Sequence, residues 1–424
     1  MRATRAAGES RSGAAGKSRM DGAMREEKRG MDMNIQRLER LRELAQEMVD
    51  TGFIAGVNCM VMQHGKEICY YEAGYRDKAA GKKMTRDTIF RLYSMTKPVT
   101  SAAVMILLQE GKIDLLDPVS RYLPGFKEQY VIDKGIVYPV VKPMTIQNLL
   151  NMTSGLVYLG EGNAAEVRCG QLIDEIIAKL DTDQALTTVE IANRVGQLPL
   201  AFQPGENWQY GLSADILGAI VEVVSGMRFG EFLEKRIFAP LGMNDTAFYV
   251  PQEKQDRLSK VYRALPEGLA EEHFSHLGIR NGMDRQPAYE AGGAGLASTI
   301  DDYAKFNQML LHKGSYNGVQ ILTPHTVQFM TTVHVTAKQQ RGVDTWESLA
   351  GYTYGNLMRI LDRPEQTVGF GSKGEYGWDG WLGTYMMNDP AHELTFLMMQ
   401  QKADSGTTEY TRRMRNVVFS ALEE

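Results

Sequence analysis

Ser94, Met95, Thr96 and Lys97 form the only Ser-x-x-Lys sequence in this chain of 424 residues. Residues three apart on a helix are neighbours, so a helix that starts here brings the Lys97 amine within reach of the Ser94 hydroxyl. Pro98 suits a first helical turn but not a helix interior, which places Ser94 at the helix start. There, unpaired backbone N–H groups and the helix dipole favour negative charge on the serine oxygen. The pattern predicts a serine nucleophile beside an amine.

The tetrad by itself also has a purely structural explanation. Serine often caps a helix N-terminus, and lysine can lay its stem along apolar neighbours. The run from Val99 to Leu107 is apolar and predicts a helix buried on most sides, so Lys97 would be partly buried in either case. Evidence from other segments of the chain is needed to distinguish a catalytic serine and lysine from a helix cap and a packing lysine.

Tyr210 is the candidate base because the family resemblance given below implies that it lies beside Lys97; it stands in a loop segment from Pro204 to Ser213 that ends where a helix is expected near Ala214. A free phenol, with a pKa of about 10, is a poor base at neutral pH, but a neighbouring lysine cation favours the phenolate. We therefore expect Lys97 and Tyr210 to share a proton and one of them to take the proton of Ser94. The chain has 19 tyrosines, so Tyr210 alone would be read as a packing residue.

The composition is that of an ordinary globular protein and favours small molecules as its partners. Hydrophobic residues make up 43% and charged residues 23% of the chain, and the net charge of −5 comes without a basic patch, which argues against nucleic-acid binding. Seven histidines and three cysteines show neither a His-Glu-x-x-His pattern nor metal-ligand spacing, so no metal or cofactor is expected. No Gly-x-Ser-x-Gly elbow of an α/β-hydrolase occurs.

The sequence also bears on location. Residues 1–33 contain no apolar stretch of the kind that a secretory signal requires and are expected to be disordered. No run reaches the roughly 20 apolar residues that span a bilayer, and the sparse cysteines suit a reducing compartment. These features predict a cytoplasmic protein that does not bind membranes.

The two chain ends carry matching elements, each an amphipathic helix and a pair of strand-like runs joined by a short turn. This arrangement predicts one antiparallel sheet built from both ends of the chain. The expected elements are a helix over 34–52 with strands at 53–62 and 67–74, and strands at 384–388 and 394–400 with a helix over 409–422.

The middle of the chain is instead helical in pattern, with Pro and Gly punctuation between the helices. We therefore expect an α/β lobe from residues 34–125 and 290–424, and a mainly helical inserted lobe from residues 126–289. The small residues of Ala291–Leu296 allow close backbone approach at the return point. The expected helices cover 145–151, 169–180, 189–195, 214–225 and 229–238.

Five segments in order resemble the serine β-lactamase and penicillin-binding superfamily, most closely the bacterial family VIII carboxylesterases, whose fold is close to class C β-lactamases. The resemblance extends from about Asn34 to the C-terminus. It implies an α+β, β-lactamase/transpeptidase-like fold, with an antiparallel sheet flanked by helices plus the inserted helical lobe. The segments are Phe90–Val99, Leu108–Val119, Leu149–Leu156, Phe202–Gly218 and Tyr376–Gly380.

The resemblance implies an oxyanion hole formed by the backbone N–H groups of Ser94 and Trp381. Two features depart from the β-lactamase pattern. Trp378 and Asp379 stand where those enzymes hold the substrate carboxylate with a lysine or histidine and a hydroxyl residue, and Leu212 stands where an asparagine is usual. Both changes disfavour penicillins and peptides and favour uncharged acyl esters. A substrate pocket that includes Trp378, Asp379, Gly380, Leu212 and Tyr158 is the resulting hypothesis.

The sequence thus predicts a cofactor-free serine carboxylesterase for short to medium acyl esters, with an acyl-enzyme on Ser94 and with Lys97 and Tyr210 as the proton-transfer pair. A β-lactamase or D-alanyl peptidase, and an acyltransferase with the same nucleophile, remain as alternatives. A binding protein on the same scaffold is disfavoured because Ser94, Lys97 and Tyr210 are all present.

Overall fold

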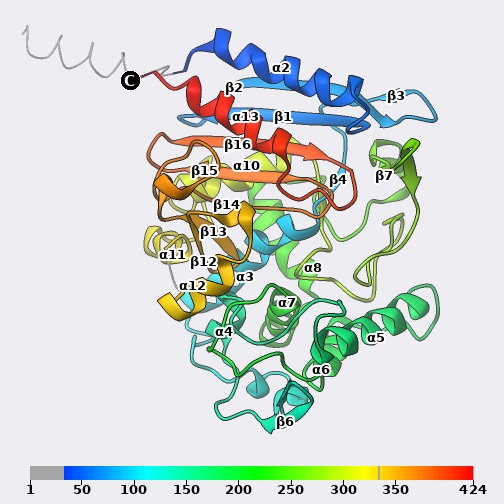
Figure 1. Cartoon of the computed structure of the whole chain (residues 1–424), viewed down its shortest axis with the longest axis vertical. Helices are drawn as coiled ribbons and strands as arrows, with labels where there is room; N and C mark the ends of the chain where they lie inside the picture. Colours follow the sequence, from blue (N-terminus) through cyan, green and yellow to red (C-terminus); the bar gives the residue numbers. More distant parts are fainter. Residues whose placement is uncertain (1–32, 333–334, 424) are drawn as a thin grey trace, which may run out of the picture.

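An eight-stranded antiparallel sheet forms the centre of the protein, in a computed structural model that describes residues 33–332 and 335–423 (Figure 1). Of the segment expected to be disordered, residues 1–32 lie outside the described residues. The strand order is β12-β13-β14-β15-β16-β1-β2-β3. The strands are β1 Gly56–Gln63, β2 Lys66–Asp77, β3 Lys82–Lys83, β12 Tyr352–Gly355, β13 Met358–Leu361, β14 Tyr376–Asp379, β15 Tyr385–Asp389 and β16 Leu394–Gln400.

The expected sheet built from both chain ends is confirmed. β1 pairs antiparallel with β16, from Val57 opposite Gln400 to Gln63 opposite Leu394. Two terminal helices, α2 (Ile35–Asp50) and α13 (Glu409–Ser420), lie side by side over one face of the sheet (Figure 1). Their apolar positions pack on alternate residues of the strands beneath, because successive strand residues point to opposite faces.

The other face of the sheet packs on helices. α10 (Ile300–Leu311) contacts β15 and β16, and α3 (Thr96–Gln109) contacts β14 and also α7 (Ser213–Ser225) in the helical part. Residues 96–107 of α3 are all buried, as its apolar pattern predicts. α3 is therefore the element shared by the sheet and the helical part.

The expected helices of the middle segment are present, with ends that differ by a few residues. They are α4 Ile146–Leu150, α5 Ala164–Lys179, α6 Thr188–Val195, α7, and α8 Phe229–Leu233 followed by a π-helical turn Glu234–Phe238. Two hairpins, β5–β6 (Tyr130–Asp133 and Ile136–Pro139) and β7–β8 (Val261–Leu265 and Gly268–Glu272), were not expected in this segment. β6 is wholly exposed and has no alternation of apolar and polar residues, so it gave no periodic signal.

The remaining elements are short and lie in the connections. The two-residue strands β4 (Phe90–Arg91), which precedes Ser94, and β9 (Ala297–Ser298), which follows the middle segment, pair with each other. The others are α9 Ala239–Leu241, α11 Pro324–Met330, α12 Ala337–Val343, β10 Ser315–Tyr316 and β11 Val319–Gln320. No helix in the described ranges is long and apolar enough to cross a bilayer.

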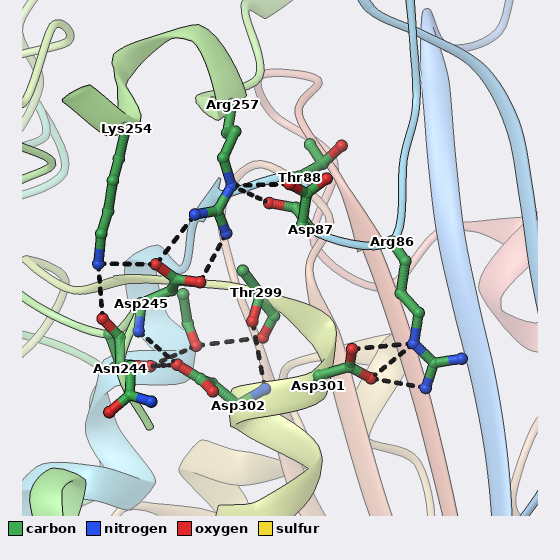
Figure 2. Close-up of polar contacts among 12 residues, drawn as sticks. Arg86, Asp87, Thr88, Asn244, Asp245, Lys254, Arg257, Thr299, Asp301 and Asp302 are labelled. Atoms are coloured by element: carbon green, nitrogen blue, oxygen red, sulfur yellow. Dashed lines mark hydrogen bonds and ion pairs between the residues drawn. The ribbon is translucent and has the colours of Figure 1, made fainter. Parts of the chain in front are cut away.

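An ion-pair network fastens the middle segment to the body of the protein near β4 (Figure 2). The Asp245 carboxylate accepts from Arg257 at 2.6 and 3.1 Å and lies 2.8 Å from the Lys254 amine. Arg257 also donates to the backbone carbonyl of Asp87, and Asp302 at the start of α10 accepts the Asp245 N–H at 2.7 Å. Arg257 thus ties the middle segment to the chain just before β4, and hence before Ser94.

We predict that Arg415→Met lowers the free energy of unfolding by about 3–5 kcal/mol, because it leaves the Glu375 carboxylate buried without its ionic partner. Arg415 fastens α13 to the sheet by two hydrogen bonds of 2.6 and 2.8 Å to Glu375, whose side chain is 0% exposed. Urea unfolding followed by circular dichroism measures the effect. Arg413→Met on the same helix removes an exposed pair with Glu47 and should cost less than about 1 kcal/mol. Equal losses for the two variants would contradict the prediction.

Candidate active site

Ser94 lies in a single 3₁₀ turn, Tyr93–Met95, that leads directly into α3. Tyr93 has a φ of 45°, which costs energy for a residue with a side chain. The turn is held in this shape from both sides, since the Leu92 N–H donates to the Leu296 carbonyl at 2.8 Å and the Leu92 carbonyl accepts from the Thr384 hydroxyl at 2.9 Å. The predicted position of Ser94 at the helix start is therefore confirmed.

Gly380 allows the end of β14 to lie against this turn. A Cβ atom at position 380 would stand 2.2 Å from the Leu92 carbonyl oxygen, so any side chain would push the two segments apart. The Gly380 N–H bonds the Thr384 carbonyl at 2.7 Å, which closes the loop that carries Trp381. The segment Tyr376–Gly380, one of the five that carry the family resemblance, thus meets the Ser94 turn through backbone atoms.

Lys97 is wholly buried, and its amine has three oxygen neighbours. Nζ lies 3.1 Å from Ser94 Oγ, 3.0 Å from the Tyr158 hydroxyl and 2.8 Å from the Gly293 carbonyl oxygen. Burial lowers the pKa of Lys97 to about 7, against smaller opposing effects of the carboxylates of Asp215 and Asp379. Near neutral pH a large fraction of the amine is uncharged and able to accept the Ser94 proton.

Tyr210 lies beside Ser94, as predicted, but its ionisation differs from the expectation. Its hydroxyl hydrogen-bonds Ser94 and accepts from the Trp378 indole N–H at 2.9 Å. Burial raises the pKa of Tyr210 above its ordinary value, and these hydrogen bonds offset only part of that effect. The hypothesis that the lysine cation favours a phenolate is therefore corrected: desolvation dominates, and Tyr210 is a phenol in the resting site.

Aromatic side chains surround the Tyr210 ring. Its centroid lies 5.5 Å from that of Tyr158, 5.4 Å from that of Trp378 and 5.2 Å from that of Trp346. The Lys97 ammonium nitrogen lies 4.5 Å from the ring centroid. Leu212 is buried in the same hydrophobic cluster, at the start of α7. The structure thus gathers Ser94, Lys97 and Tyr210 with two of the predicted pocket residues, Tyr158 and Trp378.

Asp379 is not brought into this group. It follows Trp378 on β14, so its side chain points to the opposite face of the sheet. There its carboxylate accepts from the Thr407 hydroxyl at 2.8 Å and lies 3.6 Å from a guanidinium nitrogen of Arg359. The predicted place of Asp379 in the substrate pocket has no support in this arrangement.

Trp381 is fixed by its side chain. The indole N–H donates to Asp404 at 2.7 Å, and the ring stacks on His276 at 4.1 Å between centroids and packs at 5.0 Å from Tyr93. These contacts hold the backbone of the residue next to Gly380 rigidly beside the Ser94 turn. A Trp381 N–H in an oxyanion hole remains a prediction.

Three features of the site were not predicted. Tyr158 was named for a substrate pocket, yet its hydroxyl contacts Lys97. Gly293 supplies a carbonyl to the same amine, and Asp215 is a buried carboxylate behind it. Asp215, an acidic residue in the apolar stretch Ala214–Val221, is the one signal that the sequence offered. Within the described part of the chain, no group of three or more His, Cys, Asp or Glu side chains is placed to hold a metal ion.

Comparison with known proteins places the chain in a family. The model of the beta-lactamase family matches residues 41–418. Esterase EstB of Burkholderia gladioli is 30% identical over 381 residues, covering 87% of this chain and 91% of EstB. A putative D-alanyl-D-alanine carboxypeptidase of Escherichia coli K12 is 27% identical over 396 residues, 88% of this chain and 84% of that protein. The structure of EstCE1, a hydrolase with promiscuous acyltransferase activity, superimposes with a TM-score of 0.76 at 26% identity, covering 91% of this chain and 99% of EstCE1.

The chain belongs to the beta-lactamase family, and the predicted fold class is confirmed. The expectation of an enzyme is confirmed at the level of a serine hydrolase.

We predict that modification of Ser94 follows the ionisation of Lys97. The lysine accepts a proton only when neutral, so the rate should rise with pH around a midpoint near 7 and level off above it. The measurement is the second-order rate of inactivation by a p-nitrophenyl phosphonate from pH 5 to 9. Lys97→Arg, which stays charged across this range, should abolish the rise, and a pH-independent wild-type rate would refute the assignment.

A second prediction concerns the indole that holds Tyr210. Trp378→Phe keeps an aromatic ring but removes the 2.9 Å hydrogen bond, so kcat should fall about ten-fold with a smaller change in KM. Steady-state kinetics on a p-nitrophenyl ester gives both values. Trp346→Phe is the matched control, because Trp346 packs edge-on against Tyr210 without that bond. Similar losses in the two variants would show that packing alone matters.

Proposed function

We propose that this protein is a carboxylesterase that hydrolyses short to medium acyl esters through an acyl-enzyme on Ser94. The observation that carries the proposal is a serine hydroxyl 3.1 Å from a buried lysine whose pKa is about 7, next to Tyr210. An uncharged amine in contact with a hydroxyl at a helix start is the arrangement that a serine nucleophile needs.

In acylation, Ser94 Oγ attacks the ester carbonyl carbon while its proton passes to Lys97 Nζ. The backbone N–H groups of Ser94 and Trp381 hold the negative oxygen of the tetrahedral intermediate. The intermediate collapses, the bond to the alcohol oxygen breaks, and the lysine proton reaches that oxygen by way of the Tyr210 hydroxyl, which hydrogen-bonds Ser94. The alcohol departs and the acyl group stays on Ser94.

Deacylation repeats these steps with water in place of the serine. A water molecule gives a proton to neutral Lys97 and attacks the acyl carbonyl, and Ser94 leaves with a proton returned from the same amine. Tyr210 again passes the proton between the amine and the reacting oxygens. The carboxylic acid is released and the site returns to its starting protonation.

Neutral acyl esters suit the residues around the cluster. By the resemblance, Trp378 occupies the position at which β-lactamases use a cationic side chain to hold the substrate carboxylate. Here the indole offers no cation, and its N–H donates a hydrogen bond to Tyr210. The rings of Tyr158 and Trp378 lie against Tyr210, and Leu212, two residues along the chain from Tyr210, is buried in the apolar core. The 30% identity to Esterase EstB supports the same substrate class.

Acyl transfer to an alcohol in place of water is a second candidate, favoured by the 26% identity to EstCE1, a hydrolase with promiscuous acyltransferase activity. The same acyl-enzyme would serve, with an alcohol replacing water in the second step. Adding methanol or butanol to the assay separates the two outcomes by product analysis.

We predict that the protein hydrolyses p-nitrophenyl acetate, butyrate and octanoate. The rate of hydrolysis should fall by at least about 10³-fold in Ser94→Ala and by about 10²-fold in Tyr210→Phe. A chromogenic cephalosporin should be cleaved far more slowly than the esters. Ser101→Ala, a buried serine on the same helix outside the cluster, is the control and should retain activity. Fast cephalosporin turnover would instead favour a β-lactamase, and full ester activity in Ser94→Ala would overturn the mechanism.

A further inference from the structure

Asp215 is a buried carboxylate in the first turn of α7. One oxygen, Oδ1, accepts the Tyr289 hydroxyl at 2.8 Å and the Gly293 N–H at 3.0 Å. The other oxygen, Oδ2, is buried and has no hydrogen-bond partner among the described residues. A half-satisfied carboxylate in a protein interior is costly unless a nearby positive charge compensates it.

Gly293 connects this carboxylate to the lysine. Its N–H donates to Asp215, and its carbonyl accepts from the Lys97 amine at 2.8 Å. A Cβ atom at position 293 would lie 2.5 Å from Asp215 Oδ2. Only a glycine can therefore approach the carboxylate this closely. The position of the carbonyl that orients Lys97 therefore depends on Asp215.

Asp215 is also the main compensating charge for Lys97. The charged and titratable groups that act on the amine are Asp215 from α7, Asp379 from β14 and the phenols of Tyr158 and Tyr210, and Asp215 has the largest Coulomb effect. Tyr289 faces Asp215 itself, and Cys169 on α5 lies near both. The attraction is mutual, because the charge of Lys97 is the first of the effects that oppose the burial of Asp215.

We propose that Asp215 is a positioning residue that orients Lys97 through Gly293 and stabilises the ammonium formed when the proton of Ser94 moves to the amine. The proposal rests on the function proposed above. In the step concerned, the Ser94 O–H bond breaks and a Lys97 N–H bond forms. Asp215 takes no proton and remains a carboxylate, so its role is electrostatic, as a buried aspartate acts on the histidine of a serine protease.

The test is the pH profile of Ser94 phosphonylation in Asp215→Asn. The amide keeps an acceptor for Gly293 and Tyr289 but removes the charge. Without that charge the pKa of Lys97 falls, so the acidic limb should move to lower pH by about one unit. The ammonium formed in the reaction also loses its counterion, so the plateau rate should fall about ten-fold. A limb that moves down in pH while the plateau falls is a signature that lost packing does not produce.

Asp379→Asn is the matched control, because it removes the second carboxylate that acts on Lys97 from the opposite face of the sheet. The acidic limb of the pH profile of Asp379→Asn should move less than the acidic limb of Asp215→Asn. An unmoved limb in Asp215→Asn, or an equal shift in both variants, would overturn the proposal. Should Asp215→Asn not fold, Asp215→Ser removes the same charge and should move the limb in the same direction.

Ser94→Ala separates the two proposals. If Ser94→Ala still reacted with the phosphonate at the wild-type rate, the proposed function would fail. If Ser94→Ala were inert and Asp215→Asn kept the wild-type limb, only the role of Asp215 would fail.

Discussion

The site depends on the burial of one amine. Lys97 follows Ser94 by three residues at the start of a helix that is buried along residues 96–107, so its side chain cannot reach water. Burial disfavours the ammonium and creates a base at neutral pH, but an amine in this place also needs oxygen partners. Tyr158, Gly293 and Ser94 supply them from three separate segments of the chain. The return segment near Gly293 and the loop with Tyr158 are thus arranged around the lysine.

The sequence predicted the parts of the fold that carry a strong periodic signal. The terminal helices and the β1–β16 sheet follow from amphipathic and alternating runs, and Pro98 located Ser94 at its helix start. The sequence also predicted that Ser94, Lys97 and Tyr210 lie close together, because the family resemblance relates segments that are far apart in the chain. The β5–β6 hairpin was missed, since its exposed residues carry no pattern.

What the sequence could not predict was the balance of energies inside the site. The effect of Lys97 on Tyr210 was expected to produce a phenolate, whereas burial of both groups lowers one pKa and raises the other. Adjacent residues were assigned to one pocket, yet Trp378 and Asp379 point to opposite faces of β14. Both differences depend on tertiary burial and on the face that a strand residue takes, which local sequence does not reveal.

The pairing of β1 with β16 has a consequence for how the protein is made. Val57 is among the earliest residues of the sheet to leave the ribosome, and its partner Gln400 is among the last. The sheet therefore closes only after all the residues between β1 and β16 have been made, and until then the helices that pack on it keep apolar faces exposed. Such non-local pairing slows folding and leaves partly made chains prone to aggregation. Production of this enzyme should accordingly be sensitive to the speed of translation and to chaperone supply, more than to the strength of any single contact in the finished molecule.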